Sequence, residues 1–109
     1  MIDLDRFKSI NDTLGHKAGD NIIIQVASRL TAICRRESDI VARIGGDEFV
    51  VILNEINDIT FAALTAKAIV EIVSLPYEYE GAELITSPSV GISIFPYDTK
   101  NPHDLLKYA

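Results

Sequence analysis

The sequence predicts an α+β domain in which helices cover one face of a mainly antiparallel sheet. Three observations predict this fold class. Short apolar or alternating segments of strand character recur along the chain. Two longer segments carry apolar residues at helical spacing. The elements follow in the order β-α-β-β-α-β, with the start of a last helix, which is an order typical of α+β domains.

Composition limits the class of protein. A chain of 109 residues, 48% hydrophobic and 24% charged, is typical of one soluble globular domain. It has no apolar run of membrane-spanning length, no signal peptide and only one cysteine. We therefore expect a cytoplasmic domain, and an inner-membrane anchor on the parent protein stays open. The net charge of −6 argues against a nucleic-acid polymer as partner.

The first part of the chain predicts a strand, a loop and a helix. Residues 1–5 alternate apolar and acidic side chains, like the last part of a strand. Residues 6–19 are polar and contain glycines, which predicts a loop with at most a short helix. Asp20 or Asn21 can cap a helix that runs to about Arg35. Its inward stripe would be Ile23, Val26, Ala27, Leu30, Ile33 and Cys34.

A β-hairpin is predicted next. Two apolar segments, 40–44 and 49–53, flank the sequence Gly-Gly-Asp-Glu at 45–48. A glycine pair between strands indicates a tight turn, because glycine reaches the positive φ angles that such turns require. Asp47 and Glu48 would then lie exposed at the hairpin tip.

The second helix and a small hairpin follow. Thr60 can cap the helix, and Pro76 stops it. Its predicted inward residues are Phe61, Leu64, Ala68, Ile72 and Val73. Segments 77–80 and 83–86 surround Gly81 and predict a small hairpin.

The last part of the chain predicts a strand and a helix start. Residues 90–94 alternate apolar and small side chains up to Pro96. Asn101 can cap a helix with Pro102 in its first turn. Since the first strand begins abruptly and the last helix has barely two turns, we expect residues 1–109 to be one domain truncated at both ends.

Two acidic pairs that are distant in sequence suggest a metal site. Asp3 and Asp5 end the first apolar segment, and Asp47 and Glu48 lie at the hairpin tip. An isolated acidic hairpin tip is usually only a solvated turn. Two acidic clusters that converge, however, supply the oxygen ligands that a divalent cation such as magnesium prefers.

Several motifs together resemble the GGDEF family. They are residues 3–12 (DLDRFKSIND), 15–16 (GH), 19–20 (GD), 43–49 (RIGGDEF) and 89–93 (SVGIS). The family consists of bacterial diguanylate cyclase domains, whose ferredoxin-like fold is similar to the palm of nucleotide cyclases. The resemblance implies a nucleotidyltransferase that condenses two GTP molecules into the second messenger cyclic di-GMP and releases pyrophosphate.

The resemblance implies which residues bind metal. Asp3 and Asp47 would be carboxylate ligands of Mg²⁺ or Mn²⁺, and the Leu4 carbonyl would help. Two divalent ions can stabilise the attacking and leaving oxygens of such a displacement together. Glu48 would act catalytically, either at the metal or at the 3′-hydroxyl. For Asp5, a solvated strand-end charge and a functional role are both open.

GTP binding is implied for the segment after the first strand. Backbone N–H groups around Arg6, Phe7 and Lys8 would cradle the triphosphate, and Lys8 would add a catalytic positive charge at the terminal phosphate. Asn11 and Asp20 match the guanine-reading pair of the family. A carboxylate accepts from N1–H and the exocyclic amine of guanine, a donor pair that adenine lacks.

Arg36 and Asp39 match the RxxD product-inhibition site of the family. An arginine can form a forked contact to guanine O6 and N7, while a carboxylate accepts from the other edge. The alternative is an ion pair at a helix end. The family spacing favours an allosteric inhibitory site for cyclic di-GMP.

The implied partners are GTP, cyclic di-GMP and a second GGDEF domain, since each domain of a homodimer would hold one GTP. An attached sensor or EAL phosphodiesterase domain stays open. The family's flanking helices, one with basic phosphate contacts, are absent from residues 1–109, so these residues alone should show weak or no activity. The alternative function is a catalytically silent GTP- or cyclic di-GMP-binding module that regulates an EAL domain.

Overall fold

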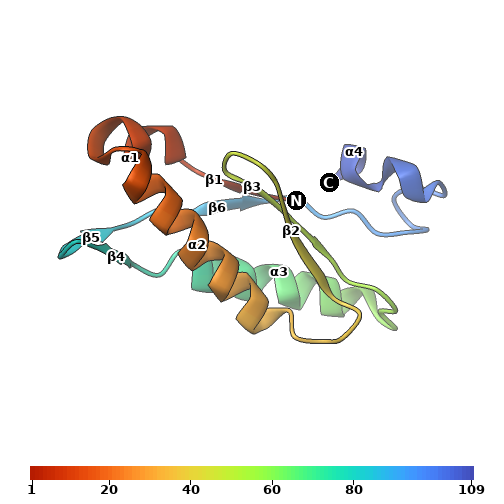
Figure 1. Ribbon diagram of the computed structural model, residues 1–109. Coiled ribbons are helices and arrows are strands. Elements are labelled where there is room, and N and C mark those ends of the chain that lie inside the picture. The colour runs from red at the N-terminus through yellow and green to blue at the C-terminus, as the bar shows by residue number, and fades with distance from the viewer.

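The computed structural model describes residues 1–109 and confirms the α+β fold class. The main sheet has the spatial order β2-β3-β1-β6, and every neighbouring pair of strands is antiparallel (Figure 1). Its strands are β1 (Ile2–Leu4), β2 (Ile40–Gly45), β3 (Glu48–Ile52) and β6 (Pro88–Val90). Strands β4 (Tyr77–Tyr79) and β5 (Ala82–Leu84) form a separate hairpin.

The helices are α1 (Phe7–Leu14), α2 (His16–Ile33), α3 (Ile59–Val73) and α4 (Leu105–Tyr108), the last preceded by a 3₁₀ turn (Pro102–Asp104). Helices α2 and α3 contact each other and cover one face of the sheet. In Figure 1, α4 lies at the end of the sheet opposite α1 and the β4–β5 hairpin. None of the helices combines the length and apolar character needed to cross a membrane.

The hydrophobic core lies between the sheet and these two helices. Ile2 and Leu4 are buried on the covered face of β1, while Asp3 between them is exposed. Phe49 pairs with Ile2 and is buried on the same face. Helix α2 adds Ile22, Ile23, Val26 and Leu30, and α3 adds Ile69 and Val73. This alternation leaves the opposite face of β1 free for polar side chains.

The segment after β1 is more helical than predicted. Residues 6–19 were expected to be mostly loop, but they form α1 and the first turn of α2, joined at Gly15. Gly15 has φ 91°, a conformation that glycine adopts without strain. Because α2 begins at His16, Asp20 lies inside the helix and is not its cap. Phe7 is buried in the core and Ile10 packs against it, and these contacts offset the polar composition of α1.

Helix α3 begins earlier than predicted and exposes a different face. Its cap is Asp58, whose side chain accepts a 2.9 Å bond from the Thr60 N–H. Phe61 and Leu64 were predicted to face inward, but both are exposed. The buried residues of the helix are Ala62, Ile69 and Val73. Phe61 instead lies against the Arg36 guanidinium, which is 4.7 Å from the ring centroid.

The last strand is shorter than predicted. Gly91 still exchanges hydrogen bonds with Met1, at 2.9 Å and 3.1 Å, but residues 92–94 are not in a strand. Ile94 bonds to Asp98 instead: its N–H donates to Oδ2, and its carbonyl accepts from the Asp98 N–H, both at 2.7 Å. The Asn101 cap is confirmed, since its side chain accepts from the His103 N–H at 3.1 Å. The predicted core position of Cys34 is also confirmed.

Candidate active site

Strand pairing brings the two acidic segments together at one end of the sheet. Because β1 pairs with β3, Asp3 lies directly opposite Glu48. The Leu4 N–H donates a 3.2 Å bond to the Asp47 carbonyl at the hairpin tip. The N–H and C=O of one strand residue point to the same side, so the Leu4 carbonyl also faces the tip. Four predicted site residues therefore meet at this junction.

The carboxylates at the junction repel one another. Desolvation by burial raises the pKa of Asp3, and the neighbouring carboxyl groups of Asp47, Glu48 and Asp5 raise it further. Asp47 is the carboxyl group that raises the pKa of Asp3 most, so the two side chains lie close together. A divalent cation between them would remove this repulsion, because opposite charge favours the ionised form.

The donor set fits a hard cation that binds few protein ligands. No preformed cluster of three or more His, Cys, Asp or Glu side chains exists in the chain. Two carboxylates with a backbone carbonyl are nevertheless typical of Mg²⁺, which commonly takes its remaining ligands from water and substrate phosphates. Mg²⁺ or Mn²⁺ is thus compatible with Asp3, Asp47 and Leu4.

The hairpin turn that carries Asp47 is held by two features. Gly46 has φ 38°, whereas Gly45 is the last residue of β2, so the conformational freedom of glycine is needed at Gly46. The Arg43 Nε donates a 2.9 Å bond to the Gly46 carbonyl. This bond fixes the turn from within its own strand.

The Asp5 carboxylate accepts hydrogen bonds from two serines, Ser89 in β6 and Ser87 just before this strand. Ser87 Oγ donates to Oδ2 of Asp5 at 2.9 Å, and Ser89 Oγ donates to Oδ1 at 2.7 Å. Thr86 Oγ1 donates to the Asp5 carbonyl at 2.6 Å. The hydroxyls of Ser89 and Ser87, followed by the charge of Arg6, hold the pKa of Asp5 below its ordinary value. The serines thus orient both carboxylate oxygens of Asp5, which is not a freely solvated strand-end charge.

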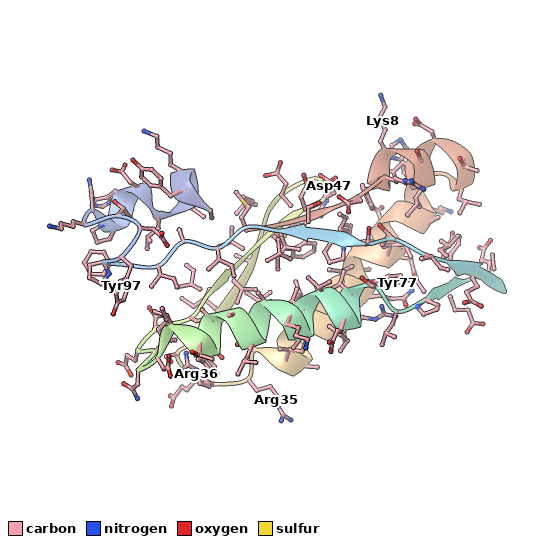
Figure 2. All side chains as sticks on the ribbon, turned by 180° about the vertical axis from the view of Figure 1, so that it is seen from behind. Lys8, Arg35, Arg36, Asp47, Tyr77 and Tyr97 are labelled. Carbon is pink, nitrogen blue, oxygen red and sulfur yellow. The ribbon has the colours of Figure 1, made fainter.

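The chain turns sharply from β1 into α1. Arg6 has φ 59°, and no side chain caps the helix. The N–H groups of the first turn, from Phe7 onward, therefore lack side-chain acceptors and present the positive end of the helix dipole. Lys8 is exposed and forms no ion pair, since the only salt bridge of the chain lies elsewhere. Figure 2 shows Lys8 and Asp47 on the side of the sheet away from α3.

Asn11 and Asp20 lie on neighbouring helices. Asn11 is in α1, and its side chain lies against α2 at Gly19. Asp20 follows Gly19 and is exposed. The packing of α1 against α2 therefore brings the two positions to the same region, with Gly19 between them.

Arg36 and Asp39 form a closed ion pair. The Arg36 Nη2 and Nε lie 2.8 Å and 2.9 Å from Oδ1 of Asp39, whose side chain is only 2% exposed. Nη2 also donates to the Asn54 carbonyl at 2.7 Å, and the guanidinium lies 4.7 Å from the Phe61 ring centroid. Arg36 lies on the α3 side of the sheet, away from Asp47 (Figure 2). The RxxD pair is thus separate from the carboxylate junction.

The main apolar cavity does not coincide with the junction. It measures about 460 Å³, is mostly apolar, and lies between β3, α3 and the C-terminal residues. A second hollow of about 430 Å³ is lined by Asp5, Arg6, Ile85, Thr86 and Ser87, beside the end of β1. The converging carboxylates, rather than cavity size, therefore identify the candidate site.

Sequence reasoning missed the serine pair and Gly19. Ser87 and Ser89 are two residues apart, a spacing that places both hydroxyls on one face of a strand. Their partner Asp5 is 84 residues from Ser89, so the contact depends on strand pairing that local patterns do not contain. Gly19 was noted as a loop residue and as part of a family motif, but its contact with α1 was missed because the helix around it was not predicted.

Comparison with known proteins shows the family. Residues 1–109 match the family model described as "Diguanylate cyclase, GGDEF domain". The chain is 42% identical over 107 residues to the diguanylate cyclase TpbB of Pseudomonas aeruginosa, covering 97% of this chain and 24% of TpbB. It is 41% identical over 106 residues to the bifunctional diguanylate cyclase/cyclic di-GMP phosphodiesterase MucR of the same species, covering 97% of this chain and 15% of MucR. The chain thus spans a quarter or less of the length of these curated relatives.

Solved structures of GGDEF domains resemble this chain as well. The GGDEF domain of TpbB from Pseudomonas aeruginosa has a TM-score of 0.92 at 41% identity, covering 97% of this chain and 62% of that chain. The GGDEF domain of DgcB from Caulobacter crescentus, solved with c-di-GMP, has a TM-score of 0.70 at 33% identity, covering 83% of this chain and 54% of that chain. Such domains have the palm-like cyclase fold that was expected. The chain therefore belongs to the GGDEF diguanylate cyclase domain family.

Proposed function

We propose that this domain is a metal-dependent diguanylate cyclase that condenses two GTP molecules into cyclic di-GMP and pyrophosphate. One observation carries the proposal: Asp3 and Asp47 meet at the β1–β3 junction. The start of α1 follows β1 after only two residues, so an anion site and a cation site adjoin. A nucleoside triphosphate with its divalent cation has the charge pattern that such neighbouring sites would bind.

In this proposal Asp3 and Asp47 hold Mg²⁺ or Mn²⁺, with help from the Leu4 carbonyl. The bound cation would supply positive charge to the phosphate oxygens during the displacement. Glu48, opposite Asp3, either completes the ligand set or accepts the proton of the attacking 3′-hydroxyl. Gly46 and Arg43 position the turn, so that Asp47 needs little rearrangement on binding.

The phosphates would bind at the start of α1. Arg6 has a left-handed backbone conformation where the chain enters α1. The backbone N–H groups of Phe7 and Lys8 are available to an anion there. Lys8 adds a mobile positive charge, which would neutralise the terminal phosphate and the leaving pyrophosphate. Phe7 anchors this segment in the core, so the cradle rests on rigid structure.

Asn11 and Asp20 would read the guanine base. The carboxylate of Asp20 is exposed, so it can accept from N1–H and the exocyclic amine of guanine. Adenine offers no matching donor pair and would leave the carboxylate unpaired. Chemistry would need two domains, because the 3′-hydroxyl on one GTP must face the α-phosphorus of the other.

A silent binding module is the second candidate function. The observation that favours it is a relative named for the other activity alone: the cyclic di-GMP phosphodiesterase NbdA of Pseudomonas aeruginosa is 38% identical over 109 residues. In that case the domain would bind GTP or cyclic di-GMP and regulate an attached EAL domain.

Turnover separates the two candidates. The protein that carries this domain is incubated with GTP and Mg²⁺ or Mn²⁺, beside Asp47→Asn and a control, Glu71→Gln, on the exposed side of α3. We expect cyclic di-GMP from the unchanged protein and the control, and at least a hundredfold less from Asp47→Asn. GTP binding without any product would refute the cyclase and leave the regulatory module.

Product inhibition at Arg36 and Asp39 is part of the proposal. Cyclic di-GMP would have to draw the Arg36 guanidinium away from Phe61 and the Asn54 carbonyl. Arg36→Ala should then raise product accumulation, whereas Arg35→Ala, an exposed neighbour, should not. Inhibition that is equally strong in both variants would remove the inhibitory site from the proposal and leave the ion pair structural.

A further inference from the structure

Gly19 leaves a space that the side chain of Asn11 fills. A Cβ atom added at Gly19 would lie 1.8 Å from Oδ1 of Asn11 and 2.9 Å from its Cγ. The next atom, Cζ of Phe7, would lie 3.1 Å away. Non-bonded carbon atoms rest at about 3.5–4.0 Å from one another. The Asn11 amide therefore lies where any side chain at position 19 would have to be.

Packing, not backbone conformation, explains the glycine. Gly19 lies inside α2, where glycine is less favourable than alanine. Its φ angle is not in the left-handed region, unlike those of Gly15 and Gly46. The helix would form more readily with alanine at this position, so what Gly19 provides is contact between α1 and α2 at Asn11.

We infer that Gly19 is a positioning residue for base recognition, because it sets where the Asn11 amide lies beside Asp20. The inference rests on the proposed function, in which Asn11 and Asp20 read guanine. Asp20 is the residue next to Gly19, so this contact fixes the Asn11 side chain against the backbone that carries Asp20. Hydrogen bonds weaken steeply outside about 2.7–3.2 Å, so a shift of Asn11 by one ångström would break its contact with the base.

The clash at Gly19 should move Asn11 without unfolding the domain. The atom at 1.8 Å is the tip of a side chain that can rotate away. The Phe7 ring at 3.1 Å needs to yield only a few tenths of an ångström. Gly19→Ala should therefore fold and keep phosphate binding, but place the Asn11 amide incorrectly.

The test is a double-mutant cycle read by nucleotide binding. GTP and ATP affinities are measured with Mg²⁺ for the unchanged protein, Gly19→Ala, Asn11→Ala and the double variant, and circular dichroism checks folding. ATP carries the same triphosphate, so its affinity reports on the phosphate and metal contacts alone. Ser28→Ala, on the exposed face of the same helix, is the control.

We expect Gly19→Ala to lower the GTP-over-ATP preference about tenfold, the loss of one hydrogen bond, with ATP affinity unchanged. Asn11→Ala should lower it equally, and adding Gly19→Ala should lower it no further. Equal losses for GTP and ATP, additive losses in the double variant, or an unfolded Gly19→Ala protein would overturn the inference and leave the proposed function intact. An unchanged protein that does not prefer GTP would instead refute guanine reading itself.

Discussion

Ser89 Oγ donates a 2.7 Å hydrogen bond to the carboxylate of Asp5, and so ties the last strand of the sheet to the end of the first. Ser87 donates to the other carboxylate oxygen at 2.9 Å. Asp5 is two residues from Asp3 and two residues from Phe7, where α1 begins. Asp5 thus stabilises the segment that links the candidate cation site to the candidate phosphate site.

The Asp5 contacts predict a pH effect. Replacing both serines by alanine should raise the pKa of Asp5 toward its ordinary value, because the hydroxyls stabilise the ionised carboxylate. A carboxyl group whose pKa is lower in the folded state stabilises the fold at pH values above its unfolded-state pKa. This stabilisation is lost as the pH falls through the folded-state pKa. The double variant should therefore lose stability mainly at neutral pH. Carboxyl ¹³C NMR titration, with Ser28→Ala as control, measures the shift; an unchanged Asp5 titration would contradict it.

The raised pKa of Asp3 predicts a pH dependence of stability with the opposite sign. This raised pKa means that the fold favours the protonated form of Asp3. Its contribution to stability is therefore complete at pH values below the unfolded-state pKa, and it is lost as the pH rises through the folded-state pKa. Asp3→Asn should therefore stabilise the metal-free protein at pH 7. Because the carboxyl is exposed and screened by solvent, the gain should be only about 0.5 kcal/mol, or roughly 2–3 °C in Tm.

Calorimetry in the presence of a chelator measures that gain. It should shrink at acidic pH, where Asp3 is protonated in both states. Glu71→Gln, an exposed control on α3, should leave Tm unchanged. A Tm that falls on Asp3→Asn at pH 7 would show that the carboxylates at the junction do not repel one another.

The two glycines of the hairpin should differ in their tolerance of alanine. Gly46 has φ 38°, where a side chain is strained, while Gly45 has ordinary strand geometry and open space around it. Gly46→Ala should cost about 1–2 kcal/mol and weaken cation binding, because the turn carries Asp47. Gly45→Ala should change stability by less than about 0.5 kcal/mol. Urea unfolding compares them, and equal costs would contradict this assignment of the turn.

Arg29 should be essential for the packing of α2 against α3. Its guanidinium donates to the carbonyls of Ile72, Leu75 and Pro76, at 3.0, 2.7 and 2.6 Å, and lies 3.7 Å from the ring centroid of Tyr77. These bonds join α2 to the last turn of α3 and to the residues that follow it.

Arg29→Ala should therefore lower the free energy of unfolding by about 2–3 kcal/mol. Lysine should recover little of it, because an ammonium group cannot reproduce the planar fork. Urea unfolding is again the measurement. Arg35, which projects away from the fold in Figure 2, is the control, and a similar loss in Arg35→Ala would contradict the prediction.

The sequence predicted the elements whose signals are local. The hairpin around 45–48, the small hairpin at Gly81 and the cap at Asn101 each depend on residues a few positions apart, and all three are confirmed. The resemblance of the motifs to the GGDEF family is confirmed by the family match. The position of Asp3 opposite Glu48 agrees with the expectation that the two acidic segments converge.

The parts that the sequence did not predict depend on tertiary contacts. The helical content of residues 6–19 comes from packing of Phe7 in the core, which outweighs a polar composition. The inward face of α3 also depends on tertiary contacts, since Phe61 lies against the Arg36 guanidinium rather than in the core. After Gly91 the chain leaves the sheet and Ile94 bonds to Asp98, and the Asp5–Ser89 bond exists only because β1 and β6 pair.

The most direct test of the central claim is the position of Mn²⁺, located by its anomalous scattering in crystals grown with a non-hydrolysable GTP analogue. We expect a metal peak about 2.1 Å from a carboxylate oxygen of Asp3 and of Asp47, with the triphosphate extending toward the start of α1. A peak bound by phosphates alone, or nucleotide bound in the apolar cavity beside α3, would contradict it.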